Sequence, residues 1–114
     1  MEISGDNYKV SYEGSAGTVT FEGIFRLGGS QDYVPIEGLL EKSLGEAPCV
    51  TLDFRKLEFA NSSAINMIYK FVVAARKRPG TKLVALGSNS VPWQSKSLLN
   101  IKKFHPAAEL LFEA

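Results

Sequence analysis

The chain has 114 residues, of which 45% are hydrophobic and 22% charged, and this composition is typical of a soluble globular protein. Thirteen basic residues stand against twelve acidic ones, and a net charge of +1 gives no general electrostatic attraction to nucleic acid or anionic lipid. A chain of this length fits one domain with a real core, so we expect a single domain over residues 1–114.

Cysteine content and hydropathy bear on the cellular compartment. A lone cysteine, Cys49, cannot form an internal disulfide, and the segment Met1–Asp6 lacks the basic and apolar regions of a signal peptide. No apolar run approaches the roughly 18 residues that a membrane-spanning helix needs. These features predict a cytoplasmic protein without a membrane span.

Hydrophobic periodicity predicts strands and helices in alternation along the chain. Apolar residues spaced by two indicate strands, and spacings of three and four indicate helices. In chain order the expected elements are a hairpin over 8–27, a helix over 33–45, a strand over 49–54, a helix over 63–78, a strand over 83–86 and one or two helices over 92–113, broken near Pro106. Gly14-Ser15-Ala16-Gly17 marks the hairpin turn, and Gly28–Gln31 forms a loop.

This order of elements defines a fold class. Helices that separate the last three strands imply parallel pairing there, whereas the opening hairpin is antiparallel. The sequence therefore predicts an α/β fold in the order ββαβαβα. It is a single domain with a mixed sheet, an N-terminal antiparallel hairpin and helices packed on the sheet. No repeat, low-complexity segment or linker indicates a second domain.

The most informative stretch joins the expected strand 49–54 to the helix that follows it. Ser62 and Ser63 lie where this helix opens, and such a position exposes hydroxyls beside unpaired backbone N–H groups and the positive end of the helix dipole. It can therefore cap the helix or accept a phosphate. Asn61 is a further cap candidate. Asp53, expected at the strand's end, could accept backbone N–H bonds in the turn.

The helix expected over 63–78 has an unusually wide apolar surface. Two neighbouring apolar stripes exceed the usual core-facing width, so some of this surface could reach solvent. The stripes comprise Ile65, Ile68, Val72 and Ala75, and Ala64, Met67, Phe71 and Ala74, with Asn66, Lys70, Val73 and Lys77 opposite. The basic run Arg76-Lys77-Arg78 falls in the last turn, where cations complement the helix dipole.

Catalytic and metal-binding patterns are weak in this chain. The single histidine, His105, lies some forty residues from the serines, and one His with one Cys shows no metal-ligand spacing. The glycine-rich loops lack the Gly-Lys-Ser/Thr sequence that cradles nucleotide phosphates. We therefore expect no catalytic activity, cofactor or metal. Trp93 could anchor a partner or simply pack at a helix start.

One motif resembles that of a known family. The apolar strand with Asp53, the turn and helix start Phe59-Ala60-Asn61-Ser62-Ser63-Ala64-Ile65, and the order of elements around them look like the STAS domain of bacterial anti-sigma factor antagonists. The tail Leu98-Leu99-Asn100-Ile101-Lys102-Lys103-Phe104 is similar to the Leu-x-x-x-Gly-Leu segment that closes many such domains, with Lys103 where glycine often stands. The resemblance covers nearly the whole chain.

The resemblance implies a switch without catalysis of its own. In that family a partner kinase phosphorylates a serine or threonine at the helix start, and a PP2C-like phosphatase reverses the step. The kinase is often an anti-sigma factor of the histidine-kinase-like ATPase type. By position, Ser63 matches the phosphoacceptor and Ser62, the runner-up, the serine before it. Asn61 replaces the usual aspartate, and Ala64 the common glycine.

The same resemblance implies a recognition surface. It comprises the helix start at Asn61 to Lys70 and the nearby loop at Gly28 to Gln31. The expected partner-binding residues are Asn61, Ser62, Ala64, Asn66, Met67, Lys70, Gly29 and Ser30, with Asp53 supporting the phosphosite. The alternative is a constitutive STAS-like scaffold or accessory subunit of an ATPase, transporter or signalling complex, in which the serines only cap the helix.

Overall fold

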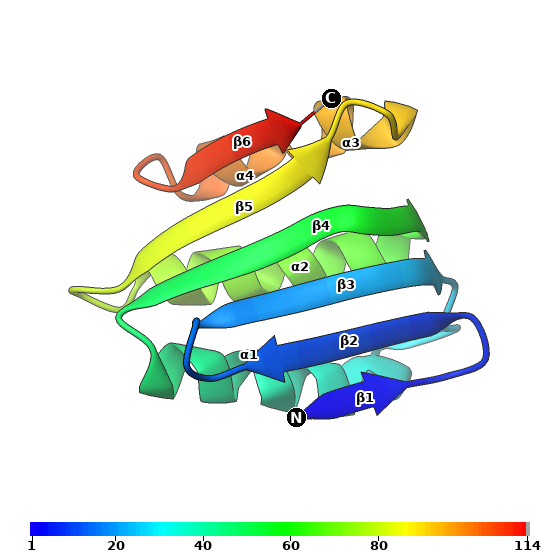
Figure 1. The fold of residues 1–114 in the computed structure, drawn as a ribbon, viewed down its shortest axis with the longest axis horizontal. Helices are drawn as coiled ribbons and strands as arrows, with labels where there is room; N and C mark the ends of the chain where they lie inside the picture. The colour runs from blue at the N-terminus through cyan, green and yellow to red at the C-terminus, as the bar shows by residue number, and fades with distance from the viewer. Residues whose placement is uncertain (114) are drawn as a thin grey trace.

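Six strands form one mixed sheet in the computed structural model, which describes residues 1–113 apart from the side chain of Ser30 (Figure 1). The strands, in chain order and in sheet order alike, are β1 (Glu2–Ser4), β2 (Tyr8–Glu13), β3 (Thr18–Phe25), β4 (Cys49–Ala60), β5 (Lys82–Ser88) and β6 (Glu109–Glu113). Strands β1 to β3 pair antiparallel, and β3 to β6 pair parallel. The expected mixed α/β fold is confirmed.

The helices cover a single face of this sheet. They are η1 (Ser30–Tyr33), α1 (Val34–Glu46), α2 (Ser62–Arg76), α3 (Pro92–Ser97) and α4 (Asn100–Phe104). In Figure 1, α1, α2 and α4 lie behind the strands. Residues that alternate toward them are almost fully buried, such as Phe21 on β3 and Leu52 on β4, each 1% exposed. Their neighbours Thr20 and Thr51 are half-buried on the opposite, open face.

The two edge strands were absent from the sequence prediction. The short β1 pairs with β2, and β6 replaces the end of the helix expected over 92–113. Helix α4 ends at Phe104, shortly before Pro106, because proline has no backbone N–H to donate to a helical hydrogen bond. Downstream, Leu110 and Phe112 are half-buried and alternate with exposed neighbours. The helical prediction was wrong here because a five-residue segment with three consecutive apolar residues has no decisive period.

Strand β4 extends beyond the expected 49–54 to Ala60. Its pairing with β5 ends at Asp53–Leu86, and the register with β3 shifts between Thr20 and Glu22. Beyond Asp53, side chains of α3, and no longer the backbone of β5, form hydrogen bonds with β4. The Gln94 amide donates to the carbonyls of Phe54 (2.7 Å) and Leu57 (2.9 Å). These bonds satisfy buried backbone groups that the sheet leaves unpaired.

The residues of α3 also show how Trp93 packs. Its indole Nε1 donates to the carbonyl of Glu58 at 2.9 Å, and its ring packs against the core. The neighbouring Gln94 is fully buried, and its Oε1 accepts from the backbone N–H of Ser88 at 2.8 Å. Trp93 therefore packs at the start of a helix, which was one of the two roles open from sequence.

Candidate interaction site at the start of α2

Asn61 holds the start of α2 to its surroundings. Its Oδ1 accepts a hydrogen bond from the backbone N–H of Ala64 (3.0 Å) and another from the Tyr33 hydroxyl (3.1 Å). Its Nδ2 donates to the carbonyl of Leu27 at 3.1 Å. Asn61 is thus the N-cap of α2, and it ties the helix to η1 and to the loop after β3. The loop and the helix start therefore lie together, as the predicted recognition surface requires.

Tyr33 supports this arrangement from the buried side. The residue is 1% exposed, and burial raises the pKa of its hydroxyl, with nearby negative charges adding to the shift and a backbone hydrogen bond opposing it. The phenol therefore stays protonated at neutral pH and remains a hydrogen-bond donor to Asn61. The cap is built entirely from neutral groups.

The two serines occupy the first turn of α2 in different environments. Ser62 is exposed, whereas Ser63 is half-buried and lines a cavity of about 150 Å³ together with Tyr33, Glu37, Asn66, Met67 and Lys70. At this cavity the Lys70 ammonium lies 3.7 Å from the Glu37 carboxylate. Among the described residues neither serine hydroxyl forms a hydrogen bond with the protein. The cap is Asn61, so the serines do not serve as caps.

The other predicted contact residues fall into two groups. Asn66 and Lys70 are exposed on α2, and Gly29 is the N-cap residue of η1. Met67 is 4% exposed but still lines the cavity. Ala64, in contrast, is 1% exposed and packs into the core, so its prediction as a partner-facing residue was wrong. The side chain of Ser30 lies outside the part of the chain that the structure describes.

Asp53 does not support the helix start. It lies in the middle of β4 on the open face of the sheet, seven residues before the strand ends at Ala60. At about 3.3 Å per residue this places it on the order of 20 Å from the end of the strand. The prediction that Asp53 assists a phosphosite was wrong because the strand continues through Arg55 and Lys56, whose polarity resembles that of a turn.

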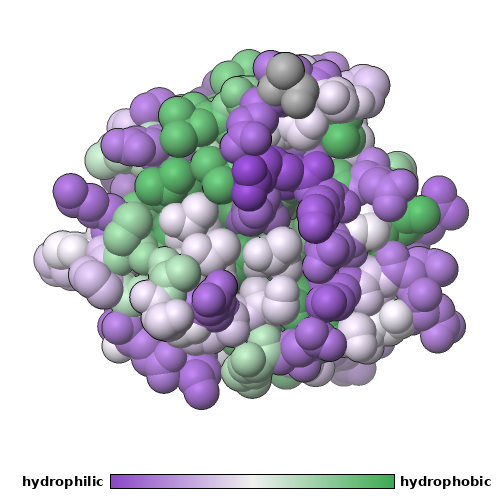
Figure 2. All heavy atoms as spheres, in the orientation of Figure 1, coloured by the Kyte–Doolittle hydropathy of each residue, from purple (hydrophilic) through white to green (hydrophobic). Residues whose placement is uncertain are grey.

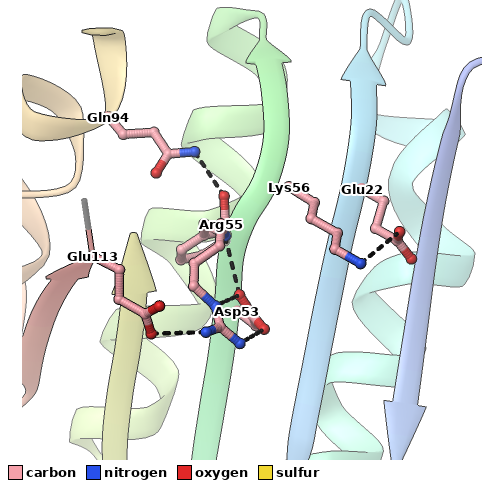
Figure 3. Close-up of polar contacts among 7 residues, drawn as sticks. Glu22, Asp53, Arg55, Lys56, Gln94 and Glu113 are labelled. Carbon is pink, nitrogen blue, oxygen red and sulfur yellow. Dashed lines mark hydrogen bonds and ion pairs between the residues drawn. The ribbon is translucent and has the colours of Figure 1, made fainter. Parts of the chain in front are cut away.

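The carboxylate of Asp53 has a structural partner instead (Figure 3). Burial disfavours its charged form, but hydrogen bonds and the positive charge of Arg55 outweigh burial and lower the pKa of Asp53. The Arg55 guanidinium donates to both carboxylate oxygens, at 3.0 and 2.8 Å, and to Glu113 on β6 at 2.7 Å. Arg55 therefore links β4 to β6 across the open face.

The open face is otherwise mixed in character (Figure 2). A polar region crosses its centre, where Lys56 lies 4.0 Å from Glu22, and an apolar group covers β5 and β6. The apolar group contains Leu111, which is 51% exposed, and the half-buried Val84 and Leu86.

The described residues form no arrangement typical of catalysis around the serines. Both ring nitrogens of His105 are buried without a hydrogen-bond partner, so the ring is not bonded to either serine. Within residues 1–113, no three His, Cys, Asp or Glu side chains gather as a metal site would require. No helix in this described part is long and apolar enough to cross a membrane.

Comparison with known proteins finds similarity in structure only. No protein-family model matches the chain, and no curated protein does. Apo-SiaC from Pseudomonas aeruginosa superposes with a TM-score of 0.75 and 13% identity, over 100% of this chain and 98% of that one. A chain in the complex of the diguanylate cyclase SiaD with its activator SiaC gives 0.72 and 12%, over 99% of both chains.

An anti-sigma factor antagonist from Mycobacterium paratuberculosis also shares the fold. Its TM-score is 0.60 at 13% identity, and the superposition covers 100% of this chain and 84% of that one. At such identities the likeness concerns the fold alone. The fold is STAS-like, as the motif at the start of α2 predicted.

Proposed function

We propose that this domain is a protein-interaction switch of the anti-sigma factor antagonist type. In this proposal a partner binds the surface at the start of α2, and phosphorylation of Ser63 releases it. The observation that supports this proposal most strongly is that Asn61 and Ser63 have separate roles at the start of α2. Asn61 caps the helix, and the Ser63 hydroxyl, which lines a small cavity, forms no hydrogen bond with the residues that the structure describes. The domain itself performs no catalytic step.

The position of Ser63 suits a reversible charge. A phosphate carries about two negative charges at neutral pH, and the N-terminus of a helix accommodates such charge through its dipole and free N–H groups. Lys70 also lines this cavity, where its ammonium is paired with the Glu37 carboxylate. Modification should therefore leave the fold intact. In the middle of a bound interface the same charge would cost a few kcal/mol, because it would be buried without a matched partner.

Two classes of partner are consistent with this switch. The family resemblance favours an anti-sigma factor that is also a serine kinase of the histidine-kinase-like ATPase type, with a PP2C-like phosphatase as its opponent. The superposition with SiaC adds a second class, because SiaC is described as the activator of a diguanylate cyclase. We place the domain in a bacterial cytoplasm, in a signalling pathway that controls transcription or the activity of a partner enzyme.

The constitutive scaffold is the competing proposal. In a scaffold the two serines would matter only as helix caps, yet the cap of α2 is Asn61. This observation favours the switch. Incubation with the cognate kinase and ATP, followed by intact-mass measurement, separates the two proposals: a switch gains one phosphate, and a scaffold gains none.

Charge substitutions test the physical basis of the switch. We expect Ser63→Glu to leave the free energy of unfolding unchanged or to raise it by up to about 0.3 to 1 kcal/mol, because a negative charge in the first turn interacts favourably with the helix dipole. The same variant should weaken the complex with the co-purified partner at least about tenfold, which corresponds to 1.4 kcal/mol. Ser63→Ala should retain binding and lose regulation. Thermal melts and titration calorimetry measure both effects.

Ser62→Glu is the matched control, because it adds the same charge one residue away on an exposed side chain. We expect it to weaken partner binding less than Ser63→Glu does. A Ser63→Glu variant that melts well below the wild type would place Ser63 inside the fold. Normal binding by that variant would place the recognition surface elsewhere.

A further inference from the structure

Charges are segregated along the chain in a way that the net charge conceals. Eight of the thirteen basic residues, and none of the twelve acidic ones, lie between Phe59 and Ala108. This segment contains α2, β5, α3 and α4. Among the charged residues in the rest of the chain, acidic ones predominate, and they include Glu37, Glu41 and Glu46 of α1. The helical layer is therefore acidic along α1 and basic along α2 to α4.

The basic residues of this segment are mostly without acidic partners. Lys70 pairs with Glu37, and no other basic residue between Phe59 and Ala108 forms an ion pair with the described residues. Lys102 donates only to the carbonyl of Ala108, at 2.9 Å. Outside the segment, by contrast, Lys9, Lys42, Arg55 and Lys56 all lie within 4.0 Å of a carboxylate. Apart from the pair between Lys70 and Glu37, the described residues give this basic surface no counter-charge.

An apolar groove crosses this basic surface between α2 and α4. Tyr69, Val73, Ala74 and Phe104 contribute its apolar lining, and Lys70 and Lys77 lie along it. Phe104 is 38% exposed, and its ring lies 5.0 Å from the ring of Tyr69. The groove is a shallow depression of about 630 Å³, open to solvent.

The wall of the groove is held in place by hydrogen bonds. The Tyr69 hydroxyl donates to the carbonyl of Ser97 at 2.8 Å and accepts from the Asn100 side chain at 3.2 Å. These bonds connect α2 to the segment that carries α3 and α4. A preformed wall lowers the entropic cost of ordering the groove when a partner binds.

The spacing of the two lysines limits what the groove can bind. Lys70 and Lys77 are seven residues apart, which is two helical turns or about 10.5 Å, and Val73 and Ala74 lie between them. A second helix that packs along α2 would match this pattern with acidic residues at positions i and i+7 and apolar residues at i+3 and i+4. A phosphate backbone would leave the apolar lining uncovered.

We infer that the α2–α4 groove binds an amphipathic helical segment of a protein partner, one with acidic residues that flank a short apolar stripe. The inference rests on the proposed function, because it names the class of segment that the partner of the α2 surface presents. Its evidence is independent of Ser63, since that residue does not line the groove.

A designed peptide tests the groove directly. The probe is a fluorescein-labelled peptide of about 16 residues with two repeats of Glu-x-x-Leu-Leu-x-x-Glu, long enough to form a helix when bound. Fluorescence anisotropy with the unphosphorylated domain measures its affinity. We expect a version with Gln at every Glu position to bind at least about tenfold more weakly. Backbone amide NMR should show the largest shifts at Tyr69, Val73 and Phe104.

Variants of the domain provide the matched comparison. Lys77→Glu should weaken binding of the Glu peptide at least about tenfold. Lys82→Glu makes the same charge change on β5, outside the groove, and this control variant should bind the peptide like the wild type. Circular dichroism confirms that both variants are folded. Equal binding by Lys77→Glu, equal binding of the Gln peptide, or shifts confined to other elements would overturn the inference.

Two further arms separate other anionic partners. The same assay is run with phosphatidylserine vesicles and with duplex DNA. If either binds the domain more tightly than the Glu peptide does, and Lys77→Glu abolishes that binding, the groove binds that ligand instead of a protein segment and the inference is overturned. The assay uses no kinase. Failure of peptide binding with Ser63 phosphorylation intact removes only the groove, and absence of phosphorylation with peptide binding intact removes only the switch.

Discussion

Two polar clusters sit on or just after strand β4, and they are built differently. At the end of the strand, Asn61 joins Tyr33 and Leu27 through hydrogen bonds between neutral groups. In the middle of the strand, Asp53 and Arg55 form an ion pair that extends to Glu113. We refer to these as the Asn61 cluster and the Asp53 cluster.

The difference shows what each cluster can do. In the Asp53 cluster each of the two carboxylates accepts a hydrogen bond from the Arg55 guanidinium, and the role of the cluster is to connect β4 with β6 on the open face. The Asn61 cluster fixes the start of α2 without using any charge. The helix N-terminus beside Ser63 therefore remains available for a negative group, which is what a phosphorylation switch needs.

The largest expected effect comes from the opposite side of β4. Leu52 is 1% exposed, so Leu52→Asp would bury an unpaired carboxylate and should cost about 4 kcal/mol or more of unfolding free energy. Thr51→Asp is the control on the open face and should cost much less. Urea denaturation followed by circular dichroism measures both. A native-like transition for Leu52→Asp would mean that the two faces of β4 are assigned incorrectly.

Gln94→Leu should have the next largest effect. The change keeps much of the volume but leaves the carbonyls of Phe54 and Leu57 and the N–H of Ser88 without a protein partner. Unsatisfied buried groups cost about 1–3 kcal/mol each, so we expect a loss of roughly 3 kcal/mol. The exposed neighbour Ser95, changed to Ala, serves as the control. Equal stability of both variants would show that Gln94 is dispensable for β4.

Asn61→Ala tests the Asn61 cluster itself. Loss of an N-cap side chain costs about 0.5–2 kcal/mol, and here two further hydrogen bonds are lost, so we expect a value near the upper end. Asn61→Asp keeps the acceptor that caps Ala64 and should retain more stability than the alanine variant. Denaturant melts compare the two. If Asn61→Ala is as stable as the wild type, one of the serines must be able to cap α2.

Asp53→Asn should have the smallest effect at neutral pH and a characteristic pH dependence. The pKa of Asp53 is lowered from 3.8, so its ion pair contributes stability above that pH and the contribution is lost as the pH falls through the folded-state value. The wild type should therefore lose more stability than the variant on acidification. Denaturation at pH 7 and pH 3 measures this, with the exposed Glu13→Gln as control. Parallel acid losses in wild type and variant would contradict the role of the pair.

Long periodic segments made most of the fold predictable from sequence. The apolar spacing in α1 and α2 and the alternation in β2 and β3 each predicted an element within a few residues of its bounds. The second half of β4 was missed because Arg55-Lys56 and Glu58-Phe59 are exposed in pairs, which breaks the period of two. Strand β6 was missed because its pairing with β5 is a tertiary contact that a five-residue run does not encode.

The candidate site was predictable where the helix start alone determines it. Asn61 as a cap, and the exposure of Asn66 and Lys70, follow from local sequence and helical spacing. The burial of Ala64 depends on how α2 rolls against the sheet, and the remoteness of Asp53 depends on the length of β4. The contact between Lys70 and Glu37 joins two helices, and no local pattern would reveal it.

The central claim is that the helix N-terminus beside the Asn61 cluster accepts a phosphate on Ser63. It is tested most directly by mapping phosphate on the protein purified from its own cells. Tandem mass spectrometry of the peptide that contains Ser62 and Ser63 distinguishes the two hydroxyls. Our account predicts phosphate on Ser63, which lines the cavity beside Lys70. Phosphate confined to the exposed Ser62, or no phosphate at either serine after treatment with the cognate kinase and ATP, would contradict it.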